Sequence, residues 1–177
     1  MTAKPSQGTA GAAGGAGRRA TAPWRLHTDG AARGNPGPAG IGVVLVDPDG
    51  VVAERVAQAI GATTNNVAEY TALITGLERA LARGVRHLEV YSDSELMVRQ
   101  LNGQYRVKNE GLKPLFRQAL ELAARFDAVR FIHVPREQNR EADRLANQGI
   151  DAAGEAAAPA GPDGGLNGRD RASTQER

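Results

Sequence analysis

One acidic residue, set between an apolar strand and a turn of Gly and Pro, constrains this chain more than any other feature. The stretch Leu26–Pro38 reads LHTDGAARGNPGP, and the run Ile41–Val46 beyond it predicts a second strand. Aspartate is depleted in strands, and a buried unpaired carboxylate costs considerable free energy. Asp29 therefore either opens a turn, as Asp-Gly pairs often do, or has a function at the end of its strand.

The rest of the sequence predicts an ordered series of strands and helices. Apolar alternation predicts strands at residues 24–28, 40–46, 51–59, 87–91 and 129–134. Apolar residues at spacings of three and four, with their start and stop signals, predict helices at residues 64–83, 94–101, 113–125 and 139–148. Strands in hairpin order, followed by strands that alternate with helices, indicate an α/β fold with a mixed sheet.

Length and composition divide the chain into one domain and two tails. A single domain typically takes ~100–200 residues, and this chain has 177. Residues 1–22 are rich in Gly, Ala and Thr and predict a disordered, weakly basic arm. Residues 151–177 return to Ala, Gly and Pro and predict a disordered tail. The folded domain is expected at residues 23–150.

Charge and cysteine content exclude several classes of protein. Residues 22–150 contain 16 Lys and Arg and 15 Asp and Glu, so nucleic-acid binding would depend on where the charges lie. The absence of Cys excludes disulfide scaffolds and Cys-ligated zinc. No apolar run approaches the ~18–20 residues of a membrane span, and no signal peptide is recognisable. A cytoplasmic protein without membrane contact is expected.

Three further acids stand at strand ends or helix starts, and each has a structural explanation. Glu69 follows Asn66 by three residues, which is the spacing of a capping box. Asp93 follows the fourth predicted strand and precedes a helix, and Asp143 lies one turn into the last helix. Acids at helix starts are mildly favourable because they complement the helix dipole. Taken singly, each of these acids is readily explained without a function.

Taken together, the four acids point to a metal site. Functional crevices of open α/β sheets form beyond the carboxyl ends of the strands, where Asp29 and Asp93 are expected. Helices starting nearby could bring Glu69 and Asp143 to the same place. Four carboxylates would repel one another unless hard cations such as Mg²⁺ neutralise them. Two such ions ~3.5–4 Å apart can clamp the attacking and leaving oxygens of a phosphodiester. The acids therefore predict a metal-dependent nuclease if they converge.

Four segments of the chain resemble the motifs of type 1 ribonuclease H, in the order that family has them. The segments are Thr28–Gly40, Thr64–Glu69, Tyr91–Ser94 and Asn139–Ala146, and they span nearly all of residues 24–149. Four motifs in order are far more specific than one. The resemblance implies a ribonuclease H-like fold, a five-stranded mixed sheet flanked by helices on both faces.

The resemblance also implies an activity and a cofactor. It implies an endonuclease that hydrolyses the RNA strand of RNA–DNA hybrids, leaving 5′-phosphate and 3′-hydroxyl ends. It implies that two Mg²⁺ ions, for which Mn²⁺ may substitute, are held by Asp29, Glu69, Asp93 and Asp143. One ion would activate the attacking water and the other would stabilise the departing 3′ oxygen. The implied partner is the hybrid duplex; the sequence suggests no protein partner, and a monomer is expected.

Four residues are assigned to substrate binding by the same resemblance. Asn35 and Asn66 match residues that contact the strands from the minor groove, where a 2′-hydroxyl distinguishes RNA from DNA. Asn65 is similar to a residue that contacts the DNA strand, and Thr64 to one that helps to bind a DNA phosphate. The structural alternatives are a turn residue for Asn35 and helix-entry residues for Thr64 and Asn65.

Two features depart from the best-known bacterial form of the family. That form carries a basic, Trp-rich protrusion after the third motif, whereas Gln104–Lys113 contains three cations and no Trp. The protrusion therefore looks absent or abbreviated, and the Arg18-Arg19 pair of the arm is one candidate for a substitute. Glu95 stands where that form has a Gln that contacts RNA, so this role is not transferred to Glu95.

The catalytic histidine of the family has two candidate counterparts here. Counting back from Asp143 reaches His133, which is predicted to lie within the fifth strand rather than in the loop. The loop after that strand offers Arg136, which could hold the scissile phosphate or assist product release as a cation. The structural alternatives are a strand histidine and a solvated surface charge, and Arg136 is preferred for a role in the loop.

Two other functions remain open from the sequence. The chain could be a module that binds hybrid or double-stranded RNA without cutting it, but a cluster of negative charge does not help to bind a polyanion. It could also be a related nuclease with another nucleic-acid substrate. The matches at Thr64–Asn66 and Gly34–Pro36 favour the hybrid.

Overall fold

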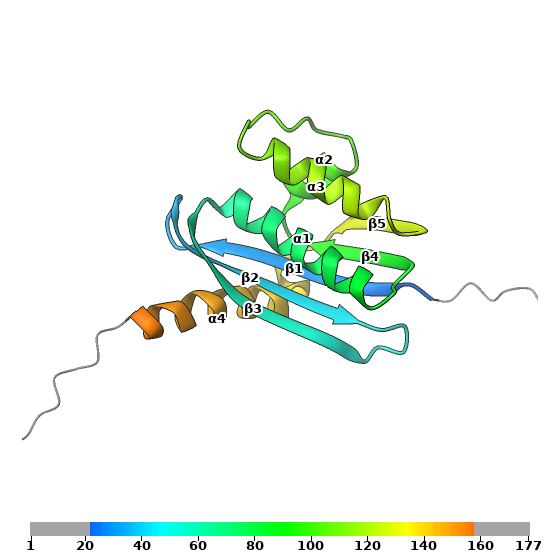
Figure 1. The fold of residues 1–177 in the computed structure, drawn as a ribbon, viewed down its shortest axis with the longest axis horizontal. Coiled ribbons are helices and arrows are strands. Elements are labelled where there is room, and N and C mark those ends of the chain that lie inside the picture. Colours follow the sequence, from blue (N-terminus) through cyan, green and yellow to red (C-terminus); the bar gives the residue numbers. More distant parts are fainter. Residues whose placement is uncertain (1–21, 158–177) are drawn as a thin grey trace, which may run out of the picture.

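A computed structural model describes residues 22–157, in which helices cover both faces of a five-stranded sheet (Figure 1). The strand order across the sheet is β3-β2-β1-β4-β5. The strands are β1 (Trp24–Ala32), β2 (Gly37–Val46), β3 (Val52–Thr63), β4 (His87–Ser92) and β5 (Ala128–His133). The helices are α1 (Asn65–Ala82), α2 (Glu95–Leu101), α3 (Lys113–Ala123) and α4 (Arg140–Ala157), with a short 3₁₀ helix η1 (Arg136–Gln138).

The sheet is mixed because its first three strands form hairpins and the next two follow helices. β1 pairs antiparallel with β2, and β2 pairs antiparallel with β3. β4 runs parallel to β1, and β5 runs parallel to β4, as crossover connections through helices allow. The five-stranded mixed sheet predicted from the sequence is confirmed.

Most of the core lies on the face that α1, α2 and α3 cover (Figure 1). Val43 and Leu45, at alternate positions of β2, point to this face and belong to one buried cluster with Leu73 and Leu77 of α1. Burying an apolar side chain of this size stabilises the fold by roughly 1.5–3 kcal/mol. This packing sets the line along which α1 crosses the sheet.

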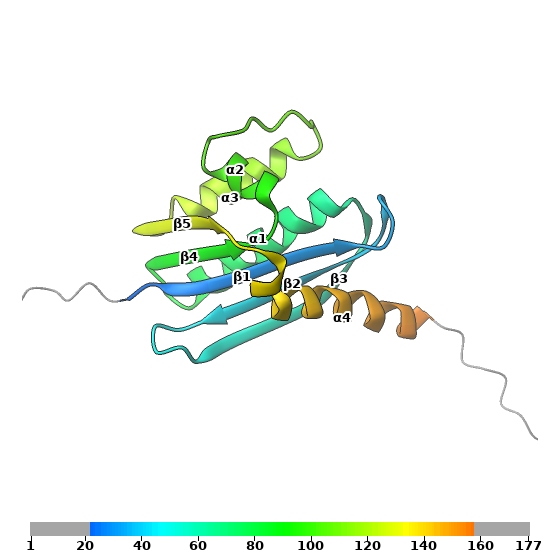
Figure 2. The ribbon, with the colours of Figure 1, turned by 180° about the vertical axis from the view of Figure 1, so that it is seen from behind.

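Helix α4 covers the opposite face, where it lies against β2 and β3 (Figure 2). Val44 and Val46 point to this face and form a second, smaller cluster with Leu145. Gly42 permits a close approach, because a Cβ built there would lie only 1.9 Å from the carbonyl oxygen of Ala142. The first turn of α4 is therefore brought directly onto the strand next to β1.

Several predicted boundaries are wrong, since β2 begins at Gly37 rather than Gly40 and β3 ends at Thr63 rather than Ala59. β1 does not end at Thr28 but continues to Ala32, because its antiparallel pairing with β2 continues that far. Helix α4 does not end at Gln148 but runs to Ala157, so residues 151–157, expected in a disordered tail, are helical. Alanine has the highest helix propensity, and four of the added residues are Ala. The remainder of the two expected tails, residues 1–21 and 158–177, lies outside the described residues.

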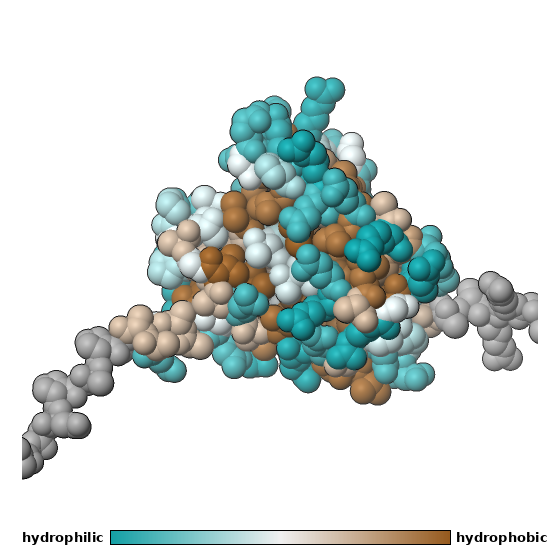
Figure 3. Space-filling model, viewed as in Figure 1, coloured by the Kyte–Doolittle hydropathy of each residue, from teal (hydrophilic) through white to brown (hydrophobic). Residues whose placement is uncertain are grey.

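The surface mixes polar and apolar character. Figure 3 shows hydrophobic and hydrophilic side chains interspersed over the face that carries α1. Among the helices of residues 22–157, none is both long and apolar enough to cross a membrane.

Candidate active site

Asp29 lies where the central strand leaves its parallel neighbour. The parallel pairing of β1 with β4 ends at His27 and Tyr91, whereas the antiparallel pairing with β2 continues to Ala32. Asp29 is therefore inside a strand and not at its end, which corrects the prediction. Asp93 follows β4 directly and meets Asp29 just beyond the last parallel pair.

Glu69 reaches the same place because the start of α1 packs against β1. Thr64 caps the helix by accepting a hydrogen bond from the Val67 N–H at 3.3 Å, so the capping box between Asn66 and Glu69 is not formed. A Cβ at Gly30 would lie 2.2 Å from the backbone nitrogen of Glu69, so only glycine allows this approach. The Gly30 N–H donates a hydrogen bond to Glu69 Oε2 at 3.1 Å.

Three carboxylates meet at this point. Oxygens of Asp29, Glu69 and Asp93 lie within 4.8 Å of one another. Asp29 and Glu69 are buried and Asp93 is half-buried. None of the ion pairs found among residues 22–157 includes any of the three. A buried negative cluster of this kind requires either protons or a bound cation.

Burial and mutual repulsion shift the protonation of the cluster. Burial, followed by the charge of Asp93, raises the pKa of Asp29 to about 8. Burial, followed by the charges of Asp29 and Asp93, raises the pKa of Glu69 well above its ordinary value. Without a cation the cluster therefore keeps protons at neutral pH, and a divalent metal would displace them on binding.

Asp143 lies beside the three-residue cluster but is not a member of it. Its charge raises the pKa of Asp29, which places it nearby. Its Oδ1 accepts a hydrogen bond from Arg136 Nη2 at 2.9 Å, and the Arg136 side chain is 72% exposed. The structure thus brings three of the four predicted acids together and pairs the fourth with a cation.

The two candidates for the catalytic histidine position differ in what they contact. His133 is the last residue of β5, as the sequence predicts, and its side chain is exposed. Arg136 lies in η1 and reaches the first turn of α4 through Asp143. Of the two, Arg136 is the one that the structure joins to a predicted site residue.

The predicted substrate-binding residues gather at the start of α1. Asn35 Oδ1 accepts a hydrogen bond from the Asn65 N–H at 3.2 Å, which ties the β1–β2 turn to the helix. Asn35, Asn65 and Asn66 are exposed, and Thr64 is half-buried and caps α1. These residues form a polar surface close to Glu69, which lies one turn further along the same helix.

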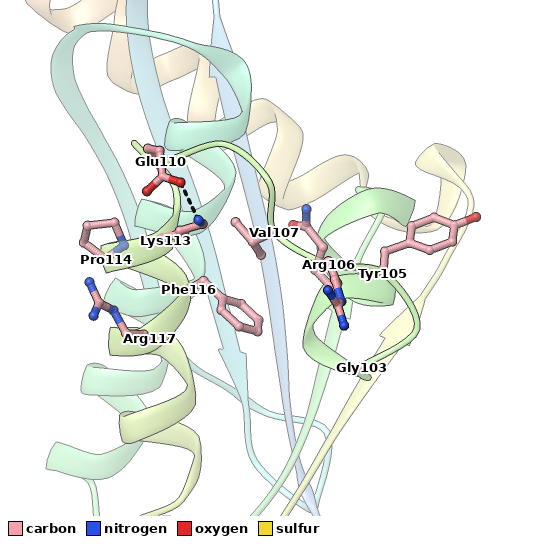
Figure 4. Close-up of a pocket in the computed structure, with 10 residues that line it drawn as sticks. Gly103, Tyr105, Arg106, Val107, Glu110, Lys113, Pro114, Phe116 and Arg117 are labelled. Carbon is pink, nitrogen blue, oxygen red and sulfur yellow. Dashed lines mark hydrogen bonds and ion pairs between the residues drawn. The ribbon is translucent and has the colours of Figure 1, made fainter.

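The segment that replaces the basic protrusion forms a hollow beside this surface. Residues 102–112 contain no helix or strand, and a cavity of about 780 Å³ lies between them, α2 and α3 (Figure 4). Lys113 forms an ion pair with Glu110 there, and Arg106 also lines the cavity. A neighbouring cavity of about 500 Å³ is lined by Asn66 and Tyr105 as well as Arg106. Glu95, at the start of α2, forms an ion pair with Arg99.

Asn139 makes side-chain contacts within the site that the sequence does not predict. From the sequence it is expected only to open the last helix, as Asn often does. In the structure it is buried, and its Nδ2 donates to the Thr28 carbonyl at 2.9 Å and, more weakly, to Asp93 Oδ1 at 3.5 Å. No local pattern signals these contacts, because Thr28 and Asn139 are far apart in the sequence.

Comparison with known proteins agrees with this geometry. A family model described as reverse transcriptase-like matches residues 27–149. A bifunctional protein of Mycobacterium tuberculosis is 47% identical over 135 residues, which are 75% of this chain but only 37% of that protein. A ribonuclease HI of Halobacterium salinarum is 44% identical over 131 residues, covering 73% of this chain and 66% of the relative.

Solved structures show the same fold. The ribonuclease H1 of Halobacterium salinarum has a TM-score of 0.71 and 43% identity, covering 73% of this chain and 98% of that one. A ribonuclease H1 obtained from compost by metagenomics, solved in complex with an RNA/DNA hybrid, has a TM-score of 0.70 and 47% identity over 73% of this chain and 98% of that one. With the matched motifs, the fold and the family model in agreement, this chain belongs to the ribonuclease H family.

Proposed function

We propose that this protein is a metal-dependent endonuclease that hydrolyses the RNA strand of RNA–DNA hybrids to 5′-phosphate and 3′-hydroxyl products. The observation that carries the proposal is the three-carboxylate cluster of Asp29, Glu69 and Asp93 beside a polar surface. The 47% identity to a ribonuclease H1 solved with a hybrid supports the choice of substrate. The expected cellular use is removal of RNA from hybrids.

The donor set fits hard divalent cations. All three ligands are carboxylates, and burial together with repulsion between them raises the pKa of Asp29 and Glu69, a cost that a bound cation would relieve. Asp29, Glu69 and Asp93 would hold Mg²⁺ or Mn²⁺, and Asp143 would join a second ion after releasing Arg136. When bound, two such ions supply an activated water and neutralise charge on the leaving 3′ oxygen.

The protein groups have separate tasks in this proposal. Gly30 holds Glu69 through its N–H, so the carboxylate has a defined orientation before metal arrives. Asn35 and Asn66 would contact the two strands from the minor groove, Asn65 would contact the DNA strand, and Thr64 would help to bind a DNA phosphate.

Arg136 is suited to a role that changes during turnover. Its guanidinium is exposed and always charged, and its partner Asp143 is also a proposed metal ligand. When Asp143 turns to a metal, Arg136 would be released to hold a phosphate. His133 is kept as the second candidate for this role.

Two alternatives compete with this function. A non-catalytic module would bind hybrid or double-stranded RNA, but the buried carboxylates would then weaken binding to a polyanion. A related nuclease would cut DNA duplexes equally well. Both alternatives are separated from the proposal by one assay.

The assay incubates labelled RNA–DNA, RNA–RNA and DNA–DNA duplexes with the protein, in Mg²⁺ or in EDTA. We expect cleavage of the RNA strand of the hybrid alone, and none in EDTA. Asp29→Asn should nearly abolish cleavage because it removes a central ligand. Asp127→Asn is the matched control, since Asp127 is an exposed acid paired with Arg86, outside the carboxylate cluster.

Each contrary result excludes a specific part of the proposal. Hybrid binding without metal-dependent cleavage would exclude the enzyme. Comparable cutting of the DNA duplex would exclude the substrate assignment. Equal activity of Asp29→Asn and Asp127→Asn would exclude the carboxylate cluster as the catalytic centre.

A further inference from the structure

Asn139 joins three elements of the site through its buried side chain and its backbone carbonyl. Its Nδ2 donates to the Thr28 carbonyl at 2.9 Å, one residue before Asp29, and lies 3.5 Å from Asp93 Oδ1. The backbone carbonyl of Asn139 accepts a hydrogen bond from the Asp143 N–H at 3.1 Å. The residue is 2% exposed. The side-chain amide of Asn139 therefore connects β1 with the end of β4, and its backbone carbonyl belongs to the first turn of α4.

The side-chain oxygen of Asn139, unlike its side-chain nitrogen, has no hydrogen-bond partner among the described residues. This oxygen, Oδ1, is buried. Leaving such an acceptor unsatisfied costs about 1–3 kcal/mol. Asn139 also lines a cavity of about 160 Å³, large enough for ordered water at about 30 Å³ per molecule. The other residues lining the cavity are His27, Val44, Val46, Gln138, Glu141 and Ala142.

His27, in β1, lines this cavity with its imidazole ring. Its imidazole stacks on Tyr91 with centroids 4.9 Å apart and planes 14° from parallel, so the ring position is well defined. His27 and Asp29 are two residues apart in β1, so their side chains lie on one face of the sheet, and Tyr91 of the neighbouring β4 lies two residues before Asp93. The stacked pair therefore forms the layer next to the carboxylates.

The His27 ring and the Asn139 amide line the same cavity. An imidazole carries at least one ring N–H in either protonation state, so His27 can donate a hydrogen bond into this cavity. No direct hydrogen bond joins the His27 ring to Asn139 Oδ1. Glu141, also at the cavity, is already held by Arg55 at 2.6 Å.

We propose that Asn139 is a positioning residue for the carboxylate cluster, and that the His27 N–H, acting through a water in the cavity, keeps the Asn139 amide in its working orientation. The orientation matters because a flipped amide would turn its oxygen toward two other acceptors, the Thr28 carbonyl and the Asp93 carboxylate. That repulsion would push Asp93 away from Asp29. The inference rests on the proposed metal-dependent function of the cluster.

The first experiment replaces the donor of Asn139 with an acceptor of the same shape. Asn139→Asp is expected to weaken Mn²⁺ binding, measured by calorimetry without nucleic acid, by about 10–100-fold. The turnover rate kcat for the hybrid should fall by a similar factor, while KM stays within about twofold, because the substrate surface at Asn35 and Asn65 is untouched. Urea unfolding of each variant confirms that the protein compared is folded.

Asn102→Asp is the matched control. Asn102 Nδ2 also donates to a strand carbonyl, that of Phe131 at 3.2 Å, but it belongs to the far end of α2 and not to the site. The same chemical change there should leave Mn²⁺ affinity and kcat unchanged. Equal losses of Mn²⁺ affinity in Asn139→Asp and Asn102→Asp would show a general structural effect and overturn the proposal.

A pair of substitutions at His27 tests the second half of the inference. His27→Phe keeps an aromatic ring for Tyr91 but has no N–H, whereas His27→Gln keeps an N–H donor without the ring. The His27→Phe variant is expected to have severalfold lower Mn²⁺ affinity and kcat than the wild type. The His27→Gln variant is expected to retain more of both. If His27→Gln lowers Mn²⁺ affinity and kcat more than His27→Phe does, His27 contributes through stacking on Tyr91 and not through a hydrogen bond. The proposed role of the His27 N–H would then be wrong.

The results also separate this inference from the proposed function. If the wild type does not cut the hybrid, the proposed function fails, whereas Mn²⁺ calorimetry still tests Asn139. If the wild type cuts the hybrid and folded Asn139→Asp binds Mn²⁺ and cuts equally well, the function stands and the positioning role is wrong.

Discussion

At the scale of single residues, the site holds carboxylates closer together than their charges favour. Asp29 and Glu69 are buried, and burial together with neighbouring charge raises the pKa of both. At neutral pH the metal-free folded protein therefore keeps protons that the unfolded chain has released. This difference makes stability depend on pH in a direction that can be worked out.

Asp29→Asn is expected to stabilise the metal-free protein, and more so as pH rises from about 4 to about 8. An unfolded Asp has a pKa of about 3.9, so between the two values only the folded state holds the proton, and wild-type stability falls as pH rises. A neutral Asn avoids this cost, and the gain at pH 8 should be roughly 1–3 kcal/mol. Urea unfolding in EDTA at pH 5 and pH 8 measures the difference.

The control for this prediction is again Asp127→Asn. Asp127 is exposed, and its hydrogen bond with Arg86 lowers its pKa, so its neutral variant should show no gain that grows between pH 5 and pH 8. A gain for Asp29→Asn that is the same at both pH values would contradict the assignment of a buried, repelled carboxylate.

At the scale of elements, glycines decide how closely the helices approach the strands. Gly30 lets the start of α1 lie on β1, and Gly42 lets the start of α4 lie on β2. Each helix carries a site acid near its start, Glu69 on α1 and Asp143 on α4. The distances of Glu69 and Asp143 from the acids on the sheet therefore depend on these two glycines.

Gly42→Ala is expected to destabilise the protein by about 1–3 kcal/mol, because the new Cβ would lie 1.9 Å from the Ala142 carbonyl oxygen. The displaced start of α4 should also lower kcat for the hybrid, since Asp143 moves with it. Urea unfolding and steady-state cleavage measure the two effects.

Gly154→Ala tests the same substitution on an open part of α4. Nothing lies within 4 Å of a Cβ at Gly154, so the change should stabilise the helix by about 0.5–1 kcal/mol and leave kcat unchanged. Similar effects of both substitutions would show that close packing at Gly42 is not what positions the helix.

At the scale of the whole molecule, the proposed metal site joins segments from across the chain. Its acids come from β1, α1 and the end of β4, with a fourth on α4, so an ion bound there links the main layers of the fold. A ligand that binds only the folded state stabilises it by mass action. Metal binding and global stability should therefore change together.

Mg²⁺ at a hundredfold excess over its dissociation constant is expected to raise the free energy of unfolding by about 2.7 kcal/mol at pH 8. The gain should disappear in Asp29→Asn, which lacks a central ligand, and persist in Asp127→Asn. Urea unfolding with and without Mg²⁺ measures it. An equal gain in all three proteins would place the stabilising ion outside the carboxylate cluster.

The sequence by itself predicted the fold class, the order of the strands along the chain and three acids that the structure brings together. Strands and helices were predictable because apolar periodicity and turn residues such as Asp47–Gly50 act over a few neighbours. Four motifs in order were enough to indicate the family. The start of α1 at Thr64 and the role of Gly84 as its end also follow from local rules, and the structure has Gly84 at φ +74°.

Only the tertiary structure decided the features that depend on distant partners. Asp29 lies inside β1 because β2 continues to pair with the strand, which the apolar run ending at Thr28 does not reveal. Asp143 pairs with Arg136 beside the cluster, and Asn139 bonds to a carbonyl 111 residues away. Local sequence carries periodicity and capping, whereas burial, pairing and amide orientation arise only when remote segments pack together.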